Sequence, residues 1–442
     1  MTNCLRINEK IKSFKDQITV DGDKSLSIRW ALMASQAFGK SKAYKLLKSE
    51  DVLSTLECLR KLGLIVKFKN DYCEITGKGP DGFMFTRGLT LNAGNSGTLG
   101  RLILGLLIHS KVKIRLIGDK SLSKRDFSRV TIPLQKFGAK IVSKSNKRLP
   151  ITIIGSNKIK PINYFENRGS AQCKTSVMLA ALNTTGKTYI KAKKSRNHTE
   201  LLFKYLKIKM KLTKNKSFDF IEIKGKQKIK PFNYEIPGDI SSSAFFMVLT
   251  TLTRRSELLI KNVNINPSRI GVIKILKKMK AKISLKNKRV YRGEKVADIL
   301  ISSSKKLKAI NCPPDLNSSA IDEFLIIFLA AAKAEGVSYF RDISELNQKE
   351  SPRLKWGSKI LNKMGVKTEL TKDSIKIYGK PDLIITKKII IKNYLKDHRV
   401  FMMSTIAALT CGGQWEIHNK DSINTSFPSF LNILRKINRK SL

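Results

Sequence analysis

The chain has 442 residues, 41% of them hydrophobic, which is enough for a sizeable core and, at ordinary domain sizes, for two or more domains. Its net charge is +52, from 86 Lys and Arg against 34 Asp and Glu, but the lysines are spread over almost every segment. We therefore expect a solvated basic surface that attracts small anions, and no nucleic-acid partner.

The sequence also indicates neither a membrane span nor a metal site. The apolar run FLIIFLAAA is about half of the roughly 20 residues that a membrane span requires, and the first residues contain no apolar signal core. The six cysteines form no CxxC pair, and no histidine stands at ligand spacing, so neither zinc nor a disulfide framework is expected. These features predict a cytoplasmic protein without a metal site or a membrane partner, and we expect a monomer.

Six segments rich in Ala, Leu, Met and Phe recur roughly every 70 to 80 residues. Each opens with small polar or charged residues that suit a helix N-terminus, and each is apolar nearly all round at helical spacing, which predicts six interior helices. The segments are 23–39, 95–110, 169–186, 238–254, 320–336 and 396–413.

A second, more amphipathic helix is predicted after each of these segments, and short β-rich runs lie between and after the helices. The second helices are expected in 52–66, 129–142, 199–210, 269–284, 353–370 and 426–438. The repeating unit is used six times, which predicts two similar α/β domains of three units each. Pro237 and Gly238 precede the fourth interior helix, so we place the domain boundary there.

The residues at the interior helix starts indicate a chemical site. A helix N-terminus presents free N–H groups and partial positive charge, which favours anions. Hydroxyl, amide and cationic side chains recur at these starts, together with a few carboxylates, and this set suits a multiply anionic substrate and acid–base chemistry. The group comprises Lys24, Ser25, Arg29, Asn95, Ser96, Gly97, Thr98, Arg101, Ser170, Gln172, Lys174, Asp322, Glu323, Asp397, His398 and Arg399.

Ten ordered motifs resemble those of the 5-enolpyruvylshikimate-3-phosphate synthase family. They include GDKSLSIR, LNAGNSGTLGRLILGLL, GSAQCKTSVMLAAL, SRNHTE, IPGDISSSAFF, KESPR and DHR, in that order between about residues 19 and 430. The resemblance implies two similar domains, each of three βαβαββ units in an inside-out α/β barrel, with the active site in the interdomain cleft. The implied domains are residues 21–237, and 1–20 together with 238–442.

The same resemblance implies transfer of the enolpyruvyl group of phosphoenolpyruvate to the 5-hydroxyl of shikimate 3-phosphate, with release of phosphate, in the route to aromatic amino acids. The implied catalytic residues are Glu350, Asp322 and Lys24. Phosphoenolpyruvate would be bound by Lys24, Asn95, Gly97, Arg125, Gln172, Arg353 and Arg399. Shikimate 3-phosphate would be bound by Lys24, Ser25, Arg29, Ser170, Ala171 through its backbone, Gln172, Arg196, Asp322 and Lys349.

Three positions depart from the family pattern. Asp21 replaces a usual proline before GDKS, which would loosen the hinge, and Pro352 replaces a usual Asp, at what would be a helix N1 position. Thr425 stands where some relatives have Lys, so no cation is assigned there. Gly97 is glycine, as in glyphosate-sensitive members, so competition between glyphosate and phosphoenolpyruvate is expected.

Two alternatives are weighed against this interpretation. The related UDP-N-acetylglucosamine enolpyruvyl transferases open the first helix with Lys-Asn and use a loop cysteine, whereas here Ser25 follows Lys24 and the loop LSKRDFSR has no cysteine. A nucleic-acid-binding protein is favoured by charge alone, without a basic motif interleaved with aromatic residues.

Overall fold

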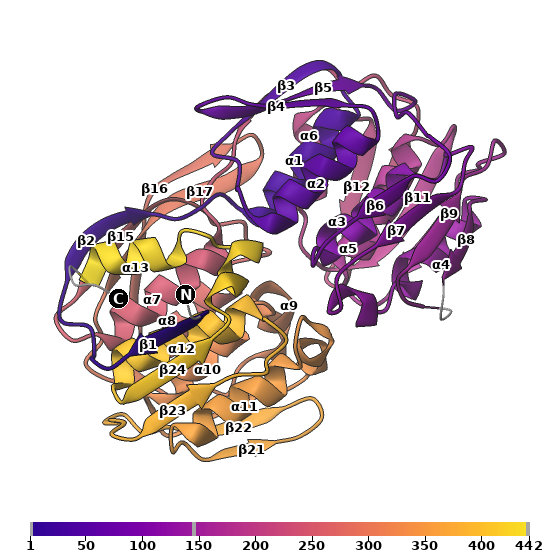
Figure 1. The fold of residues 1–442 in the computed structure, drawn as a ribbon. Helices are drawn as coiled ribbons and strands as arrows, with labels where there is room; N and C mark the ends of the chain where they lie inside the picture. The colour runs from indigo at the N-terminus through magenta and orange to yellow at the C-terminus, as the bar shows by residue number, and fades with distance from the viewer. Residues whose placement is uncertain (1–2, 144–146, 439–442) are drawn as a thin grey trace. The chain divides into compact units, whose positions relative to one another are not determined.

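The chain folds as two compact units in the computed structural model, which describes residues 3–143 and 147–438. We call the unit of Gly22–Ile236 with Arg292–Glu294 the N-unit. The C-unit holds the residues up to Asp21, Pro237–Tyr291 and the residues from Lys295 onward. Figure 1 shows both units as helices enclosed by sheets and further helices.

The N-unit is built around three helices that are buried along most of their length, because their side chains are small or apolar on every face. These interior helices are α1 (Lys24–Ser35), α3 (Gly97–Leu106) and α5 (Ala171–Leu182). Outer helices that bury one face are α2 (Glu50–Lys61), α4 (Ser128–Lys136) and α6 (His198–Tyr205), and η1 (Leu122–Lys124) is a short 3-10 turn.

Three four-stranded sheets of one topology complete the N-unit, with orders β14-β3-β5-β4, β6-β7-β9-β8 and β10-β11-β13-β12. In each sheet the first two strands pair in parallel and the other pairs are antiparallel. The strands are β3 (Phe38–Tyr44), β4 (Ile65–Phe68), β5 (Tyr72–Lys78), β6 (Thr90–Asn92), β7 (Ile114–Ile117), β8 (Lys140–Ser143), β9 (Ile151–Ile154), β10 (Asn163–Glu166), β11 (Lys187–Lys193), β12 (Met210–Lys214), β13 (Phe218–Lys224) and β14 (Asn233–Glu235).

The C-unit repeats this plan around a second trio of interior helices that contact one another. They are α7 (Ile240–Leu252), α10 (Phe324–Ala332) and α12 (His398–Cys411). The remaining helices are α8 (Gly271–Lys278), α9 (Asn317–Ala320), α11 (Arg353–Lys363) and α13 (Phe430–Asn438), with 3-10 turns η2 (Pro314–Leu316), η3 (Ser344–Gln348) and η4 (Lys420–Thr425).

The sheets of the C-unit have orders β16-β17-β15-β2, β20-β22-β21, β1-β24-β23 and β18-β19. The strands are β1 (Cys4–Ile7), β2 (Lys15–Thr19), β15 (Glu257–Asn264), β16 (Lys282–Tyr291), β17 (Glu294–Ser302), β18 (Leu307–Lys308), β19 (Ala334–Glu335), β20 (Val337–Phe340), β21 (Thr368–Leu370), β22 (Ile375–Tyr378), β23 (Lys388–Ile391) and β24 (Gln414–His418). Strand β1 pairs antiparallel with β24, so the chain's first and last strands lie side by side.

The predicted interior and outer helices are all confirmed, and so is the polar cap at five of the six interior helices. The side chains of Asp23, Ser96, Ser170, Asp239 and Asp397 each accept an N–H of the following turn. The cap prediction is wrong at α10, where Glu323 makes no such bond. Its carboxylate accepts instead from the Ser241 hydroxyl.

The tip of the β16–β17 hairpin, Arg292–Glu294, belongs to the N-unit, although the rest of both strands belongs to the C-unit. Within the N-unit, Glu294 Oε1 lies 2.6 Å from His198 Nδ1, and both side chains are buried. The repeat pattern does not indicate this excursion, because it depends on a contact between residues far apart in sequence.

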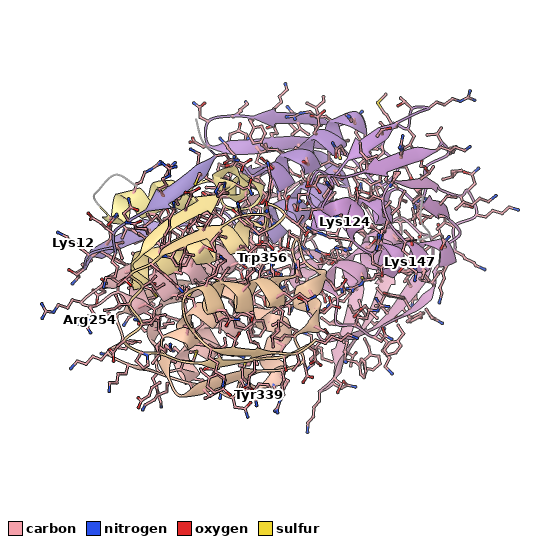
Figure 2. The ribbon with its side chains drawn as sticks, turned by 60° about the horizontal axis from the view of Figure 1, so that its bottom comes forward. Lys12, Lys124, Lys147, Arg254, Tyr339 and Trp356 are labelled. Carbon is pink, nitrogen blue, oxygen red and sulfur yellow. The ribbon has the colours of Figure 1, made fainter. Side chains whose placement is uncertain are left out.

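The basic side chains are dispersed, as the composition predicts. Lys12 and Arg254 of the C-unit project outward (Figure 2), and Lys147 of the N-unit is exposed. None of the helices in the described part of the chain has the length and apolar character that crossing a membrane requires.

Asp21, the departure from the family's usual proline, is held by hydrogen bonds within the C-unit. Its carbonyl oxygen accepts from Asp239 N at 3.0 Å, and its carboxylate accepts from Ser429 N at 3.1 Å. Burial, with a smaller contribution from the charge of Asp239, raises the pKa of the Asp21 carboxyl above its ordinary 3.8. The folded state therefore binds this proton more tightly than the unfolded state does.

We expect Asp21→Asn to stabilise the protein increasingly as pH rises above about 4. Ionising Asp21 costs more in the folded than in the unfolded chain, so its contribution to stability is lost as pH rises through the raised pKa. Asparagine keeps an oxygen for Ser429 N and has no proton to lose. From pH 4 to 7 the thermal midpoint of the variant should rise further and further above that of the parent. A difference that stays constant or shrinks over this range would contradict the assignment.

Candidate functional site

The start of α1 carries a lysine fixed by an acidic residue of α2. Asp23 Oδ1 accepts from Leu26 N at 2.9 Å and so orients the first turn. Lys24 Nζ donates to Asp51 Oδ2 at 2.8 Å, and the Lys24 side chain is still 20% exposed. This ammonium group is therefore positioned at a helix start and remains accessible to a small anion.

Arg29, one turn further along α1, is tied to the other helices of the N-unit. Its Nε donates to Thr199 Oγ1 of α6 at 2.9 Å, and its Nη1 donates to the carbonyl of Ser25 at 3.1 Å. Its Nη2 lies 3.5 Å from Thr175 Oγ1 of α5, and the two threonine hydroxyls are 2.7 Å apart. The guanidinium is thus held in one orientation by neutral oxygens, as a group that recognises an oxyanion should be.

Two further guanidinium groups, those of Arg101 and Arg125, lie at the start of α3 beside Gly97. A methyl group added at Gly97 would come within 2.8 Å of Arg125 Nη1 and 3.0 Å of Arg101 Nη1, so the glycine leaves room for both. Burial first, and then the charge of Arg125, lowers the pKa of Arg101 to about 10. This crowding of positive charge favours an anion at the same place.

Amide side chains connect these arginines to the neighbouring helix starts. Asn95 Oδ1 accepts from Arg125 Nη2 at 3.1 Å. Gln172, in the first turn of α5, accepts from Arg101 Nη1 at 2.7 Å and donates to Thr98 Oγ1 at 3.0 Å. The starts of α3 and α5 therefore meet, as the sequence pattern requires for a common site.

The Glu166 carboxylate fixes the backbone that leads into the first turn of α5. Its carboxylate accepts from the backbone N–H groups of Arg168, Gly169 and Ser170, and burial raises its pKa. Ser170 caps the helix, which begins at Ala171. Arg196 lies in the loop that leads into α6, two residues before His198.

Lys174, counted with the helix starts from sequence, has a structural position. Its side chain is 0% exposed, and its Nζ lies 2.5 Å from Glu200 Oε1 and 3.8 Å from Asp219 Oδ2. This buried ion pair joins α5 to α6 and leaves no exposed cation for a substrate.

In the C-unit, Arg353 is the centre of the charged network. Its side chain is 2% exposed, with Nε 2.9 Å from Asp397 Oδ2, Nη2 2.5 Å from Glu350 Oε2 and Nη1 3.5 Å from Asp322 Oδ1. Burial disfavours its charge, but Asp397, Glu350 and Asp322 outweigh burial and raise the pKa of Arg353. Asp322 also pairs with Lys349 Nζ at 3.1 Å.

Asp397 organises this network, a role that the sequence did not assign to it. One oxygen accepts from Ser351 N at 3.2 Å and Ser351 Oγ at 2.8 Å, and the other accepts from Arg399 N at 2.9 Å. It joins the start of α12 to the loop before α11. The available signal was its place in the DHR motif, next to a predicted ligand.

Arg399 and the start of α7 form the other side of the same cluster. Arg399 Nη1 lies 3.9 Å from Glu323 Oε1. Arg269, which was not predicted as a site residue, donates to Ser241 Oγ at 2.7 Å and lies 3.3 Å from Asp239 Oδ1. Ser241 and Asp239 at the start of α7 could have indicated that a cation lies nearby, but they do not indicate which arginine it is.

The departures at Pro352 and Thr425 have local consequences. Pro352 is the N-cap of α11, which starts at Arg353, so the expectation of an N1 position is wrong by one residue. Thr425 Oγ1 lies 3.2 Å from His398 Nδ1 and donates to the Ser422 carbonyl.

The predicted site residues thus divide between the two units, and we call the two sets clusters. The N-unit holds Lys24, Ser25, Arg29, Asn95, Gly97, Arg125, Ser170, Ala171, Gln172 and Arg196. The C-unit holds Asp322, Lys349, Glu350, Arg353 and Arg399. The first cluster is cationic and amidic, and the second combines cations with carboxylates able to transfer protons.

The fold is that of the enolpyruvyl transferases. The structure matches the enolpyruvyl transferase NikO from Streptomyces tendae with a TM-score of 0.77 over 99% of this chain and 98% of the other, at only 13% identity. At that identity the likeness concerns the fold alone.

Closer relatives define the family. The pattern of EPSP synthase (3-phosphoshikimate 1-carboxyvinyltransferase) matches residues 8–434. The 3-phosphoshikimate 1-carboxyvinyltransferase of Ruthia magnifica is 41% identical over 95% of this chain and 94% of its own. The EPSP synthase structure from Acinetobacter baumannii is 35% identical, with a TM-score of 0.85 and 98% of each chain covered. The chain belongs to the EPSP synthase family.

Proposed function

We propose that this chain transfers the enolpyruvyl group of phosphoenolpyruvate to the 5-hydroxyl of shikimate 3-phosphate, giving 5-enolpyruvylshikimate 3-phosphate and phosphate. The family match over residues 8–434 carries the proposal. The charges support it, because both substrates are multiply anionic and each unit presents cations at its interior helix starts. The enzyme would act in the cytoplasm as a monomer, without metal or organic cofactor.

Binding is divided between the two units in this proposal. Shikimate 3-phosphate is held by Ser25, Arg29, Ser170, Ala171, Gln172, Arg196, Asp322 and Lys349, with help from Lys24. Phosphoenolpyruvate is held by Lys24, Asn95, Gly97, Arg125, Gln172, Arg353 and Arg399. Each substrate draws ligands from both units in this proposal, in which residues 21–237 act as one domain and residues 1–20 with 238–442 as the other.

The reaction needs one acid that returns as a base. Glu350 protonates the methylene carbon of phosphoenolpyruvate while Asp322 accepts the proton of the attacking 5-hydroxyl, which forms the new C–O bond. Loss of phosphate then breaks the bond between this carbon and the phosphate oxygen, and the departing phosphate takes the proton held by Asp322. Glu350 removes a methyl proton to restore the double bond. Lys24 assists proton movement and stabilises the charge on the departing phosphate.

Phosphate release tests the proposal directly. The purified chain should release phosphate when mixed with phosphoenolpyruvate and shikimate 3-phosphate, and a coupled assay should detect the enolpyruvyl product. Shikimate without its phosphate should react far more slowly, because the cations that bind the 3-phosphate have no partner. Equal rates with both acceptors, or no release with either, would reject the assignment.

Glyphosate should inhibit in competition with phosphoenolpyruvate. Gly97→Ala should weaken the binding of both glyphosate and phosphoenolpyruvate. The added methyl displaces the guanidinium ends of Arg125 and Arg101, which are flexible, so folding should persist. Losing one charge-assisted contact of about 1.5–3 kcal/mol raises KM or the inhibition constant by about tenfold or more. Steady-state inhibition at several phosphoenolpyruvate concentrations measures both. A noncompetitive pattern, or an alanine variant with parental constants, would contradict the placement of Gly97.

A further inference from the structure

Cys4, Glu416 and His418 lie together on the exposed face of the β1-β24-β23 sheet. Cys4 is directly opposite His418 in the antiparallel pair β1–β24, and Glu416 stands two residues before His418 on the same face of β24. Their ligand-type atoms, one from each side chain, all lie within 4.8 Å of one another. His418 Nε2 is 2.9 Å from Glu416 Oε1.

The backbone around this cluster is fixed on several sides. Asn419 N donates to the carbonyl of Asn3, and Asn3 Nδ2 donates to Asp421 Oδ1 at 2.7 Å. The hydroxyl of Tyr394 donates to the carbonyl of His418. Because these bonds set the register of β1 against β24, only side-chain rotations are needed to change the spacing of the three groups.

From this arrangement we infer that Cys4, Glu416 and His418 form a binding site for a divalent cation of the Zn²⁺ class, which joins the first strand of the chain to the last. Thiolate, imidazole and carboxylate are all zinc ligands, with bonds of about 2.0–2.3 Å that place neighbouring ligand atoms roughly 3.5 Å apart. Sulfur and nitrogen disfavour Mg²⁺ and Ca²⁺, which prefer oxygen. A water molecule would complete a tetrahedral site.

The surrounding charges determine how the site competes for its ion. Arg6 lies opposite Glu416, and Lys388 Nζ is 3.7 Å from Glu416 Oε2. Lys388 is 59% exposed, so it can turn away when a cation arrives. With Cys4 as thiolate and Glu416 ionised, the three ligands carry a total charge of −2, which a divalent cation neutralises.

The site is independent of the proposed reaction, since its residues belong to neither of the two clusters described above. It departs from the sequence expectation, in which zinc is not indicated. That expectation used the spacing of cysteines and histidines along the chain, whereas Cys4 and His418 come from opposite ends and meet only through strand pairing.

Thiol reactivity of the full-length native protein gives the first test. Of the six cysteines, Cys4 is partly exposed and the other five are buried, so a thiol reagent such as Ellman's reagent should react with Cys4 first. Zn²⁺ at ten times its dissociation constant should slow that reaction about tenfold, because about a tenth of the sites remain free. Cys4→Ser should abolish the fast phase, and an unchanged rate at saturating Zn²⁺ would overturn the proposal.

Variants of the other ligands test the site while Cys4 stays as the reporter. His418→Gln and Glu416→Gln should each weaken Zn²⁺ protection of Cys4 at least about tenfold. Glu335→Gln is a matched control, because Glu335 is likewise a strand carboxylate paired with a lysine, Lys308 at 2.8 Å, in another sheet. Protection that is equal in all three variants would reject these ligands.

Co²⁺ can replace Zn²⁺ as a spectroscopic probe, because its absorption spectrum reports directly on the atoms that bind it. The parent should show a thiolate-to-cobalt charge-transfer band and the intense visible bands of tetrahedral cobalt, and Cys4→Ser should lack the former. Thermal midpoints without metal should match in parent and variants, because the cluster is at the surface. A weak octahedral spectrum in the parent would show that the three groups do not bind together.

Discussion

Replacing Glu350 with glutamine should lower kcat by about 10²–10⁴, the usual contribution of a positioned general acid and base. Glutamine keeps an oxygen that can accept from Arg353 Nη2, where Glu350 Oε2 now lies 2.5 Å away. It cannot give or take the proton at the methylene carbon. Phosphoenolpyruvate and shikimate 3-phosphate should therefore bind nearly as well while turnover falls.

A matched control is Glu345→Gln, which removes an exposed carboxylate from η3, a few residues upstream. Its kcat should remain within about twofold of the parent, because surface substitutions outside the site have small effects. Steady-state kinetics and equilibrium binding of shikimate 3-phosphate distinguish the two roles. A Glu350 variant with parental kcat and a raised KM would make this residue a ligand and leave the proton transfer to another group.

The sequence could predict which residues lie at the interior helix starts, because local rules decide them. Asp23, Ser96 and Ser170 cap helices in the N-unit for the reason that any short polar side chain does so, and the apolar runs behind them could only be interior. The motifs then identified the family from the same positions.

Contacts between distant segments could not be predicted in this way. The oxygens that orient Arg29 come partly from Thr199 on α6, and Asp397 holds Arg353 from the start of another helix. The β16–β17 hairpin tip joins the N-unit through Glu294 and His198. Each contact depends on side chains whose identity is common and whose proximity is set by the whole fold, so no local pattern marks them.

Arg353, the cation at the centre of the C-unit cluster, should be the cation of that cluster whose loss most destabilises the C-unit. Arg353→Met leaves Asp397, Glu350 and Asp322 facing one another without the guanidinium that now contacts all three. Removing one partner of a buried ion pair costs about 3–5 kcal/mol, because the remaining charges stay desolvated. We expect a loss of that order in the free energy of unfolding, together with loss of phosphoenolpyruvate binding.

The control is Lys355→Met, which removes an exposed positive charge two residues further along α11 and should change stability by no more than about 0.5 kcal/mol. Tryptophan fluorescence follows the unfolding of both units, because Trp356 and Trp415 lie in the C-unit and Trp30 lies in the N-unit.

The pH dependence separates lost charge pairing from lost packing. In the variant the three carboxylates repel one another, so lowering the pH should relieve this repulsion in the folded state and reduce the difference in free energy of unfolding between variant and parent. Asp397→Asn added to Arg353→Met should recover part of the loss for the same reason, which a double-mutant cycle measures. The loss of free energy of unfolding could instead stay constant with pH and be the same in the double variant. That result would mean that Arg353 stabilises α11 through its packing, with the three carboxylates contributing little.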